Sequence, residues 1–396
     1  MKRRTMNKKY LLTAAMAAIV FAGNAQPVKI KKVFADAGKQ MTLMLAEIPA
    51  ARAGHADWVS PRTIEKGSLR MVPSRDWTSG FFPGILWMLY EYTGKDTWKE
   101  QAIHYTKQLE QEKWNRGTHD MGFKLYCSYG QGYRLTGDTQ MRAVLLQAAR
   151  TLSTRFNPAA GVIRSWDHNR DKWDYPVIID NMLNLELLFA ATQLSGDSSF
   201  YRIAVGHANT TMRNHFRPDY SSYHVVSYDT TTGAPVKKNT HQGYADASAW
   251  ARGQAWGIYG YTMCYRFTKD TAYLRLAQHI ADFMLKHPHM PADGVPYWDY
   301  DAPDIPNEER DASAAAVLAS GLYELSGYVA NGKYYRKQAD HIMRSLTQRY
   351  RAPLGTADGF ILLHSTGSKP AKSEVDVPLI YADYYYLEAL LRSRGR

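Results

Sequence analysis

Hydrophobic and polar positions along the chain define two kinds of helical segment. One kind, about 15 residues long, is small or apolar on nearly every side, as in 'DNMLNLELLFAATQL' and 'DASAAAVLASGLYEL'. The other kind carries a single apolar stripe with charged residues between, as at Tyr335, Ala339, Ile342 and Leu346. A helix that is apolar all round is buried on all sides, whereas one stripe marks a helix with a solvent face. The pattern therefore predicts inner and outer helices.

A short turn recurs between each inner segment and the outer helix that follows it. Its copies are 'YTGKDTW', 'LTGDTQM', 'LSGDSSFY', 'FTKDTAY' and 'LSGYVANGKYY'. Repeats of this kind indicate one supersecondary unit used many times. The final 'VDVPLIYADYYYLEALL' predicts a sixth inner helix, whose outer partner is expected near residues 34–46. We therefore predict an all-α fold, an (α/α)6 toroid, formed by a single domain over residues 26–396.

The connections that return from outer to inner helices are long, and long loops in compact domains tend to carry function. They cover roughly residues 110–119, 153–178, 213–250, 286–310 and 350–375, and all of them open at the end where inner helices begin. Counting back about 16 residues from each turn gives side chains expected at equal depth: Thr78, Asp120, Asp180, Arg252 to Gln254, and Asp311. We expect the functional site at this end.

Two interpretations are open for Asp120 and Asp180. An Asp at a helix start commonly caps the helix by accepting backbone N–H bonds. Two carboxyl groups that face each other across a cleft can instead have different roles. Burial and mutual repulsion separate their pKa values, so one keeps a proton near neutral pH while the other stays ionised. For Asp311, which only Ala and Ser follow, the capping interpretation is favoured.

The segment 'SAWARGQAWGIYGYTMCYRF' places a cation and two indoles at the start of an inner helix. Arg252 and Trp256 share a helix face, so the guanidinium could hold a carboxylate while the ring stacks on a sugar. A buried cation needs an anion, from the protein or from a substrate. Trp250 is expected in the core. His224 and Gln242 flank a predicted hairpin, 'YHVVSYD' followed by 'TTTG', and are candidate hydrogen-bond donors or solvated loop residues.

The N-terminus has the pattern of a cleavable secretory signal over residues 1–25: five cations, an apolar run and then small residues. The protein is therefore expected to be periplasmic or secreted, without membrane insertion after cleavage. Removing the five cations lowers the formal net charge from +12 to +7, and no basic run marks a nucleic-acid arm. Cys127 and Cys264 are expected to be buried free thiols. The chain has no HExxH, CxxC, GxGxxG or GxxxxGK[ST] pattern, so we expect no metal and no organic cofactor.

Five motifs together resemble the unsaturated glucuronyl hydrolases, glycoside hydrolase family 88. They are 'HDMGF', 'IIDNMLNL', 'SSYHVVSYDTTTG', 'THQGYADASAWARGQAWGIYG' and 'ERDASAAAVLASGLYEL', and the likeness runs from 'RDWTSGFFPG' to the last helix. The resemblance implies a substrate that carries the 4,5-unsaturated uronic acid left by polysaccharide lyases on glycosaminoglycan fragments. It implies hydration of the ring double bond, with Asp180 as general acid and base and Asp120 as the charged partner.

The resemblance also implies a set of residues around the unsaturated sugar: Trp77, His119, His224, Gln242, Arg252 and Trp256. Ser365 and Ser368, in 'HSTGSKP', match a loop near the next sugar that sets sulfate preference in the family. The family pattern ends in a Lys where this chain has Pro370, and Lys369 comes one place early. This departure puts acceptance of sulfate in doubt.

Three rival functions remain at this point. An unsaturated rhamnogalacturonyl hydrolase would share the toroid and the chemistry but act on pectin fragments. An inverting glycosidase would act on saturated sugars. A non-catalytic periplasmic oligosaccharide-binding protein would need the aromatic and cationic residues but not two carboxylates at inner-helix starts.

Overall fold

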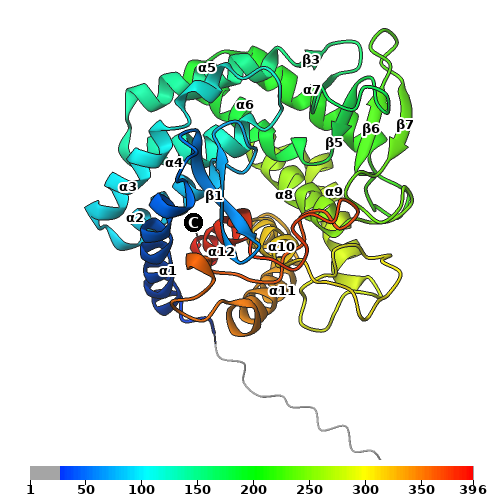
Figure 1. Cartoon of the computed structure of the whole chain (residues 1–396). Coiled ribbons are helices and arrows are strands. Elements are labelled where there is room, and N and C mark those ends of the chain that lie inside the picture. The colour runs from blue at the N-terminus through cyan, green and yellow to red at the C-terminus, as the bar shows by residue number, and fades with distance from the viewer. Residues whose placement is uncertain (1–26, 396) are drawn as a thin grey trace, which may run out of the picture.

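The computed structural model describes residues 27–395, and the repeated turn joins its helices in pairs (Figure 1). In three turns a glycine in the left-handed conformation ends the inner helix: Gly94, Gly137 and Gly196 have φ of 67°, 70° and 76°. After two of them the next residue, Asp138 or Asp197, accepts backbone N–H bonds at the start of the outer helix. The repeated sequence is thus a helix stop followed directly by a helix start.

These pairs form the predicted (α/α)6 toroid. The outer helices are α1 (Ile30–Ala51), α3 (Asp96–Lys107), α5 (Thr139–Ser153), α7 (Ser198–Asn214), α9 (Thr271–Lys286) and α11 (Gly332–Ser345). The inner elements are α2 (Phe81–Thr93), a π-helix (Gly122–Gly130) continued by α4 (Gln131–Thr136), α6 (Asn181–Ser195), α8 (Ala251–Thr268), α10 (Ala312–Ser326) and α12 (Ile380–Arg392).

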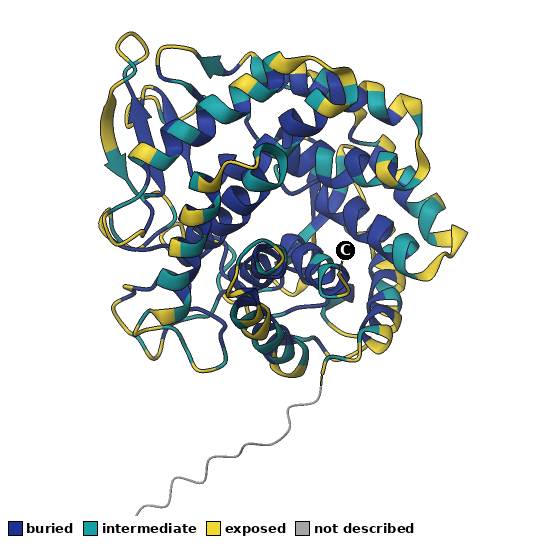
Figure 2. Ribbon diagram, turned by 180° about the vertical axis from the view of Figure 1, so that it is seen from behind, coloured by how far each residue is buried: buried dark blue, intermediate teal, exposed yellow. Residues whose placement is uncertain are grey.

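Burial separates the two rings as the hydrophobic pattern predicted (Figure 2). Almost every residue of α10 is buried, whereas α11 buries a stripe that includes Tyr335, Ala339 and Ile342. Each inner element contacts the next one along the chain, and α12 contacts α2, which closes the ring. The first and last inner helices are therefore neighbours.

The second inner element is not the continuous α-helix that the sequence predicted. Residues 122–130 form a π-helix, and tight contacts flank it. A Cβ on Gly122 would lie 2.7 Å from Asn184 Cα, and a Cβ on Gly80 would lie 2.1 Å from the carbonyl oxygen of Lys124. Only glycine permits these approaches. The wider helix therefore sits directly against both neighbouring inner helices, just after Asp120.

Short strands occur in the long connections at one end of the ring. β5 (Pro176–Ile178), β6 (Val225–Tyr228) and β7 (Pro235–Asn239) form an antiparallel sheet. The β6–β7 pair is the hairpin predicted from the sequence, but β5 was not predicted. A further small pair is β3 (Phe156–Asn157) with β4 (Val162–Ile163), and short helices cover Glu110–Trp114, Leu346–Tyr350 and Ala357–Gly359.

A hairpin of β1 (Trp58–Glu65) and β2 (Ser68–Pro73), which the sequence did not predict, ties the beginning of the domain to its end. Arg62 donates to Asp76 (2.6 Å) and to Glu374 (2.5 Å). Thr63 pairs with Leu379, just before α12. Residues separated by more than 300 positions are thus held together beside the mouth of the ring.

A buried ion pair fixes the connection that leads to Asp120. Lys124 Nζ lies 2.6 Å from Glu112 Oε2, and neither side chain is more than 5% exposed. Ser74 and Asn115 donate to the same carboxylate, each at 2.7 Å. A buried charge with its partner and hydrogen bonds in place is tolerated, but one left alone is costly. The pair therefore sets the position of the Glu110–Trp114 turn against the π-helix.

Replacing Lys124 by Met should lower the free energy of unfolding by about 3–5 kcal/mol, because Glu112 would remain buried without its cation. Urea unfolding followed by circular dichroism measures this change. The Lys124→Met/Glu112→Gln double variant should recover part of the loss, since it removes both charges. Additive losses in the two single variants and the double variant would contradict the coupling.

Two other predictions from the sequence concern the N-terminal signal segment and the two cysteines. The predicted signal segment, residues 1–25, lies outside the described residues. Over residues 27–395 no helix is both long and apolar enough to cross a membrane. Cys127 and Cys264 are both buried and unpaired, which confirms the prediction of free thiols.

Candidate active site

Strands β5 and β6 bring Asp180 and His224 together. Ile178 pairs with Val225, and the amide of Ile179 donates to the carbonyl of His224 (3.2 Å). Asp180 then begins α6, and its Oδ2 lies 3.8 Å from His224 Nε2. This distance is too long for a hydrogen bond. The two side chains face each other without being joined.

The protonation of His224 follows from its other ring nitrogen. The backbone amides of His241 and Gln242 both donate to Nδ1, each at 3.1 Å. Nδ1 therefore carries no proton, so in the neutral ring the proton is on Nε2. Burial, with the positive charges of His241 and Arg252 nearby, holds the pKa of His224 well below its usual 6.5. His224 thus presents a neutral N–H donor beside Asp180.

Asp120 is held by its neighbours in sequence. The Thr118 hydroxyl donates to Oδ2 (2.6 Å), and His119 Nε2 lies 3.1 Å from Oδ1. Burial alone would raise the pKa of Asp120, but the charge and hydrogen bond of His119 and the hydroxyl of Thr118 lower it overall. Asp120 is therefore ionised at neutral pH.

Asp180 has the opposite character. Burial raises its pKa to about 6, although His119 and Arg252 act to lower it, and the charge of Asp120 adds to the rise. Its Oδ2 is buried and has no hydrogen-bond partner within residues 27–395. The carboxyl groups of Asp120 and Asp180 thus have separated pKa values, as expected for an acid and its charged partner.

The capping interpretation does not apply to the two carboxylates. Asp180 immediately precedes α6, yet its side chain makes no capping bond, and the oxygens of Asp120 are occupied by Thr118 and His119. Asp311 does cap α10, accepting from the amides of Ser313 (3.0 Å) and Ala314 (3.3 Å). The prediction that Asp311 caps a helix is confirmed, but its other carboxylate oxygen also forms an ion pair with Arg252.

Arg252 is a cross-link between two inner helices and a loop. Its Nη1 lies 2.6 Å from Asp311 Oδ2 and 2.6 Å from the carbonyl of Thr366, and its Nη2 donates to the carbonyl of Gly367 (2.6 Å). Its side chain is 1% exposed. The anion that Arg252 requires is thus supplied by the protein. Whether Arg252 also contacts substrate stays a prediction.

Aromatic rings surround this cross-link. Arg252 lies over the rings of Trp250 (4.6 Å) and Tyr381 (5.4 Å). Trp77, which is partly exposed, packs on Tyr381 with ring centres 4.9 Å apart. Trp250 is buried, as predicted. Tyr381, on α12, was missed by sequence reasoning, because three consecutive tyrosines at 384–386 made this helix look uniformly like core.

Trp256 lies deeper than the stacking hypothesis requires. Its side chain is fully buried, and the rings of Phe123 (5.3 Å) and Tyr385 (5.4 Å) pack against it. The ring faces are therefore occupied by protein. Its Nε1 has no hydrogen-bond partner in the described chain, so the contact it can offer is a donated hydrogen bond. Its place in the site stays a prediction.

Several residues of the candidate site bury polar atoms that have no hydrogen-bond partner among the described residues. Buried polar groups are normally hydrogen-bonded, so each exception needs an explanation. Within residues 27–395 the buried atoms without a partner include His119 Nδ1, Asp180 Oδ2, Asn184 Nδ2, His224 Nε2, Trp256 Nε1, Ser365 Oγ and Tyr381 Oη. Five of these seven residues were predicted site residues. A bound polar ligand would supply the missing partners.

The 365–369 loop is fixed from both sides. Gln242 Nε2 donates to the carbonyl of Gly367 (3.1 Å), the same oxygen that Arg252 binds. Ser368 pairs through its backbone with Ser373. Lys369 Nζ lies 2.5 Å from Glu308 Oε2 and also binds Glu309. The structure therefore joins Gln242 and the serine loop to Arg252, while the positive charge of Lys369 is neutralised.

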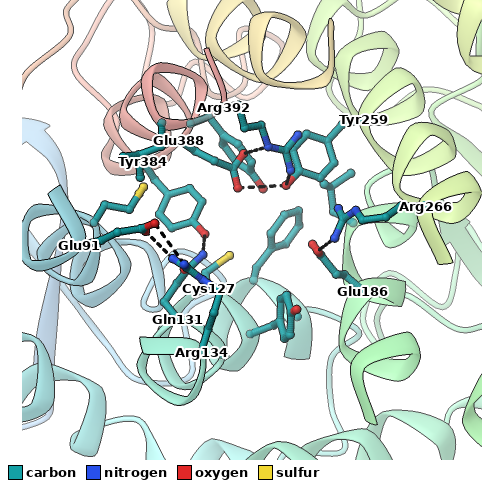
Figure 3. A pocket seen from close by; sticks show the side chains of 18 residues that line it. Glu91, Cys127, Gln131, Arg134, Glu186, Tyr259, Arg266, Tyr384, Glu388 and Arg392 are labelled. Atoms are coloured by element: carbon teal, nitrogen blue, oxygen red, sulfur yellow. Dashed lines mark hydrogen bonds and ion pairs between the residues drawn. The ribbon is translucent and has the colours of Figure 1, made fainter. Parts of the chain in front are cut away.

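A cavity of about 250 Å³ lies within the ring of inner helices (Figure 3), and its lining extends from Gly122 and Leu183, near the helix starts, to Arg134 and Arg392, near the helix ends. Its charged side chains form ion pairs: Arg134 with Glu91, Arg266 with Glu186, and Arg392 with Glu388. None of the predicted site residues lines it. The candidate chemistry is therefore at the inner-helix starts, as the sequence indicated. Over residues 27–395 no three His, Cys, Asp or Glu side chains are grouped to hold a metal ion.

Comparison with known proteins identifies the family. A sequence model of Glycosyl Hydrolase Family 88 matches residues 55–392, which include every helix of the ring except α1 and every predicted site residue. The chain belongs to glycosyl hydrolase family 88.

Relatives in this family are similar over most of their length. An unsaturated glucuronyl hydrolase of Formosa agariphila is 50% identical over 339 residues, which is 85% of this chain and 83% of that protein. An unsaturated chondroitin disaccharide hydrolase of Streptococcus pneumoniae is 36% identical over 85% of this chain and 86% of its own. The crystal structure of an unsaturated glucuronyl hydrolase specific for heparin superposes with a TM-score of 0.87 at 47% identity, covering 92% of this chain and 97% of that one.

The raised pKa of Asp180 predicts a pH-dependent stability. The folded protein holds this proton up to about pH 6, whereas an unfolded Asp releases it near 3.8. The free energy of unfolding should therefore fall as pH rises from about 4 to 6, by about 3 kcal/mol in total at 1.36 kcal/mol per unit. Asp180→Asn, which cannot ionise, should be more stable than the parent at pH 7.5 but not at pH 4.

Urea unfolding at the two pH values tests this stability difference. Asp120→Asn is the matched control, because the pKa of Asp120 is lowered and its ionised form stabilises the folded state. That variant should be less stable than the parent at pH 7.5. The same sign of change for both variants would refute the division of roles between the two carboxyl groups.

Proposed function

We propose that this protein is an unsaturated glucuronyl hydrolase. It removes the 4,5-unsaturated uronic acid from the non-reducing end of lyase-generated glycosaminoglycan oligosaccharides by hydrating the ring double bond. The observation that carries the proposal is the pairing of Asp180, whose pKa is about 6, with the ionised Asp120 in a family 88 toroid. One group can give a proton near neutral pH while the other keeps its charge.

Each step uses a group of the site. Protonated Asp180 gives its proton to C4 of the ring double bond, and positive charge develops at C5. The carboxylate of Asp120 stabilises that charge or holds ring hydroxyls. Water adds to C5 and returns a proton to Asp180, which regenerates the acid. The product is a hemiketal, which opens and releases the rest of the oligosaccharide.

The neighbours of Asp180 suit an anionic sugar. His224 offers a neutral N–H, Trp256 and Tyr381 offer unpaired donors, and Arg252 supplies a fixed positive charge. A substrate that satisfies these buried groups gains hydrogen bonds that water does not make in a closed site. The carboxylate of the unsaturated acid is such a ligand.

The names of relatives support a glycosaminoglycan substrate but differ in the polymer. The Formosa agariphila protein is named an unsaturated glucuronyl hydrolase, which specifies no polymer. The Streptococcus pneumoniae protein is named for a chondroitin disaccharide, and the crystal structure is that of an enzyme specific for heparin. In this chain the cation of the 365–369 loop, Lys369, is bound by Glu308 and Glu309. We therefore propose that sulfate near this loop gains little from Lys369.

We also propose that the protein is exported to the periplasm or outside the cell. The pattern of residues 1–25, with its cations, apolar run and small residues, supports this location. Mass determination of the protein recovered from cells would test it, because cleavage removes this segment.

An activity panel tests the function. The protein should remove the ultraviolet absorbance of unsaturated disaccharides made by lyases from chondroitin, hyaluronan and heparin, since hydration destroys the conjugated double bond. Unsulfated disaccharides should be consumed at least as fast as sulfated ones. Saturated oligosaccharides should not react. Preference for an unsaturated rhamnogalacturonan disaccharide would favour the pectin enzyme, and binding without turnover would favour a binding protein.

Replacing Asp180 by Asn should abolish turnover while leaving substrate binding nearly unchanged, because the amide cannot donate a proton to C4. In the parent, kcat/KM should fall as pH rises through about 6, where Asp180 loses its proton. Asp120→Asn should lower kcat by about 10² or more, since it removes charge stabilisation in the transition state. Stopped assays across pH 4–9 measure these effects. Near-normal activity of Asp180→Asn would reject its role.

A further inference from the structure

A second groove with an exposed tryptophan lies outside the inner ring. It runs between the Glu110–Trp114 turn and α5, with a volume of about 480 Å³. The side chains that line it include Lys107, Lys113, Trp114, Tyr129 and Arg150. We call it the α5 groove. None of the predicted active-site residues lines it.

The indole of Trp114 is exposed on a rigid support. Trp114 is 61% exposed, the most of any aromatic residue in the described chain. The Thr151 hydroxyl donates to the carbonyl of Lys113 (2.5 Å), and Glu112 is buried in its ion pair with Lys124. On the other side of Trp114, the Asn115 side-chain amide donates to Glu112 (2.7 Å), so the chain is held both before and after the indole. Tryptophan is enriched among the residues that contribute most to binding, and a fixed support lowers the entropy cost of binding through it.

Two of the cations that line the groove have no hydrogen-bonded or ion-paired partner within residues 27–395. Lys107 and Arg150 are exposed, and neither makes an ion pair or side-chain hydrogen bond with any residue from 27 to 395. Lys113 pairs with Glu110 (2.7 Å). The groove is lined by three cations and by two acids, Glu110 and Asp138, so its net charge is positive. Guanidinium and ammonium groups bind carboxylates and sulfates.

The floor of the groove holds an unpaired donor. Tyr129 is only 3% exposed, yet its hydroxyl has no hydrogen-bond partner in the described chain. Burial, with the charges of Glu110 and Asp138 nearby, raises the pKa of Tyr129, so the hydroxyl keeps its proton. Tyr129 lines the groove together with both of these acids, and its buried side chain therefore lies beneath the groove surface. A buried donor without a partner points to a missing ligand oxygen.

We propose that the α5 groove is a second carbohydrate site, which binds a saturated anionic segment of a glycosaminoglycan chain. The indole of Trp114 stacks on the apolar face of a sugar ring, Lys107 and Arg150 bind its carboxylate or sulfate, and the Tyr129 hydroxyl donates to a ring hydroxyl. The choice of ligand rests on the proposed function. The site is distinct from the Asp120 and Asp180 centre, because it binds sugar without the unsaturated ring and without reaction.

The groove lies close in sequence to the catalytic centre. Trp114 precedes Asp120 by six residues, and the Lys124–Glu112 pair fixes the connection between them. Two sites on one rigid body raise the local concentration of chain ends whenever the groove holds the polymer. The protein would thereby stay on a polymer that a lyase is cutting and take each new unsaturated end.

Calorimetric titration with a saturated chondroitin hexasaccharide tests the second site, since this probe lacks the reactive double bond. The full chain should bind it, and Trp114→Ala and Lys107→Ala/Arg150→Ala should each weaken binding about tenfold or more, which corresponds to about 1.4 kcal/mol. Both variants should keep kcat and KM for unsaturated chondroitin disaccharide within about twofold, because these residues lie outside the active site. Excess hexasaccharide should not inhibit that reaction.

Matched controls separate the groove from general effects. Leu354→Ala removes a comparably exposed apolar side chain, and Lys333→Ala/Lys337→Ala removes two exposed cations from α11. Both should bind the hexasaccharide as the parent does. Parent protein that fails to bind it, Trp114→Ala that binds normally, or the double-lysine control that loses binding equally would overturn the proposal. Absent turnover of the disaccharide by the parent would reject the proposed function and not the groove.

Tyr129→Phe provides an independent test. Without a ligand, removing an unpaired buried hydroxyl should leave the melting temperature unchanged or raise it. If the hydroxyl serves the sugar, the same variant should bind the hexasaccharide several-fold more weakly. Unchanged binding in this stable variant would remove Tyr129 from the site and overturn the assignment of the groove floor.

Discussion

The contact on which the site depends is the set of hydrogen bonds from Arg252. One guanidinium binds the carboxylate that caps α10 and two carbonyl oxygens of the 365–369 loop, so α8, α10 and that loop are fixed relative to one another. Each bond is charge-assisted and fully buried, which makes the arrangement rigid. It also places a permanent positive charge near Asp180. Arg252 therefore both positions the elements of the site and supplies its positive charge.

Around that charge the protein leaves polar groups unsatisfied. Asp180, His224 and Tyr381 each bury an atom with no partner in the part of the chain that the structure describes. Such groups reduce stability, and a protein retains them where a ligand is to bind. The same burial keeps a proton on Asp180 up to about pH 6, whereas Asp120 is ionised because His119 and Thr118 satisfy its oxygens. The burial that raises the pKa of Asp180 therefore also leaves polar atoms without partners, which lowers the stability of the site.

Local signals explain what the sequence could predict. The left-handed Gly137 ends one helix and Asp138 caps the next, and both act within one turn of chain. The sequence could therefore predict the helical repeat and the end of the ring at which the inner helices begin. The two carboxylates followed from equal spacing to those turns. The partner of Arg252, the role of Tyr381 and the β1–β2 hairpin were not readable, because each depends on contacts between residues far apart in the chain. No local periodicity encodes such contacts.

The contacts of Arg62 and Thr63 have a consequence for truncated forms of the protein. Arg62 joins the first hairpin to Glu374, and Thr63 pairs with Leu379, so the two ends of the domain hold each other. Glu374 and Leu379 lie in the segment that connects the 365–369 loop to α12. Removing either the hairpin or the C-terminal segment therefore leaves the other without these contacts.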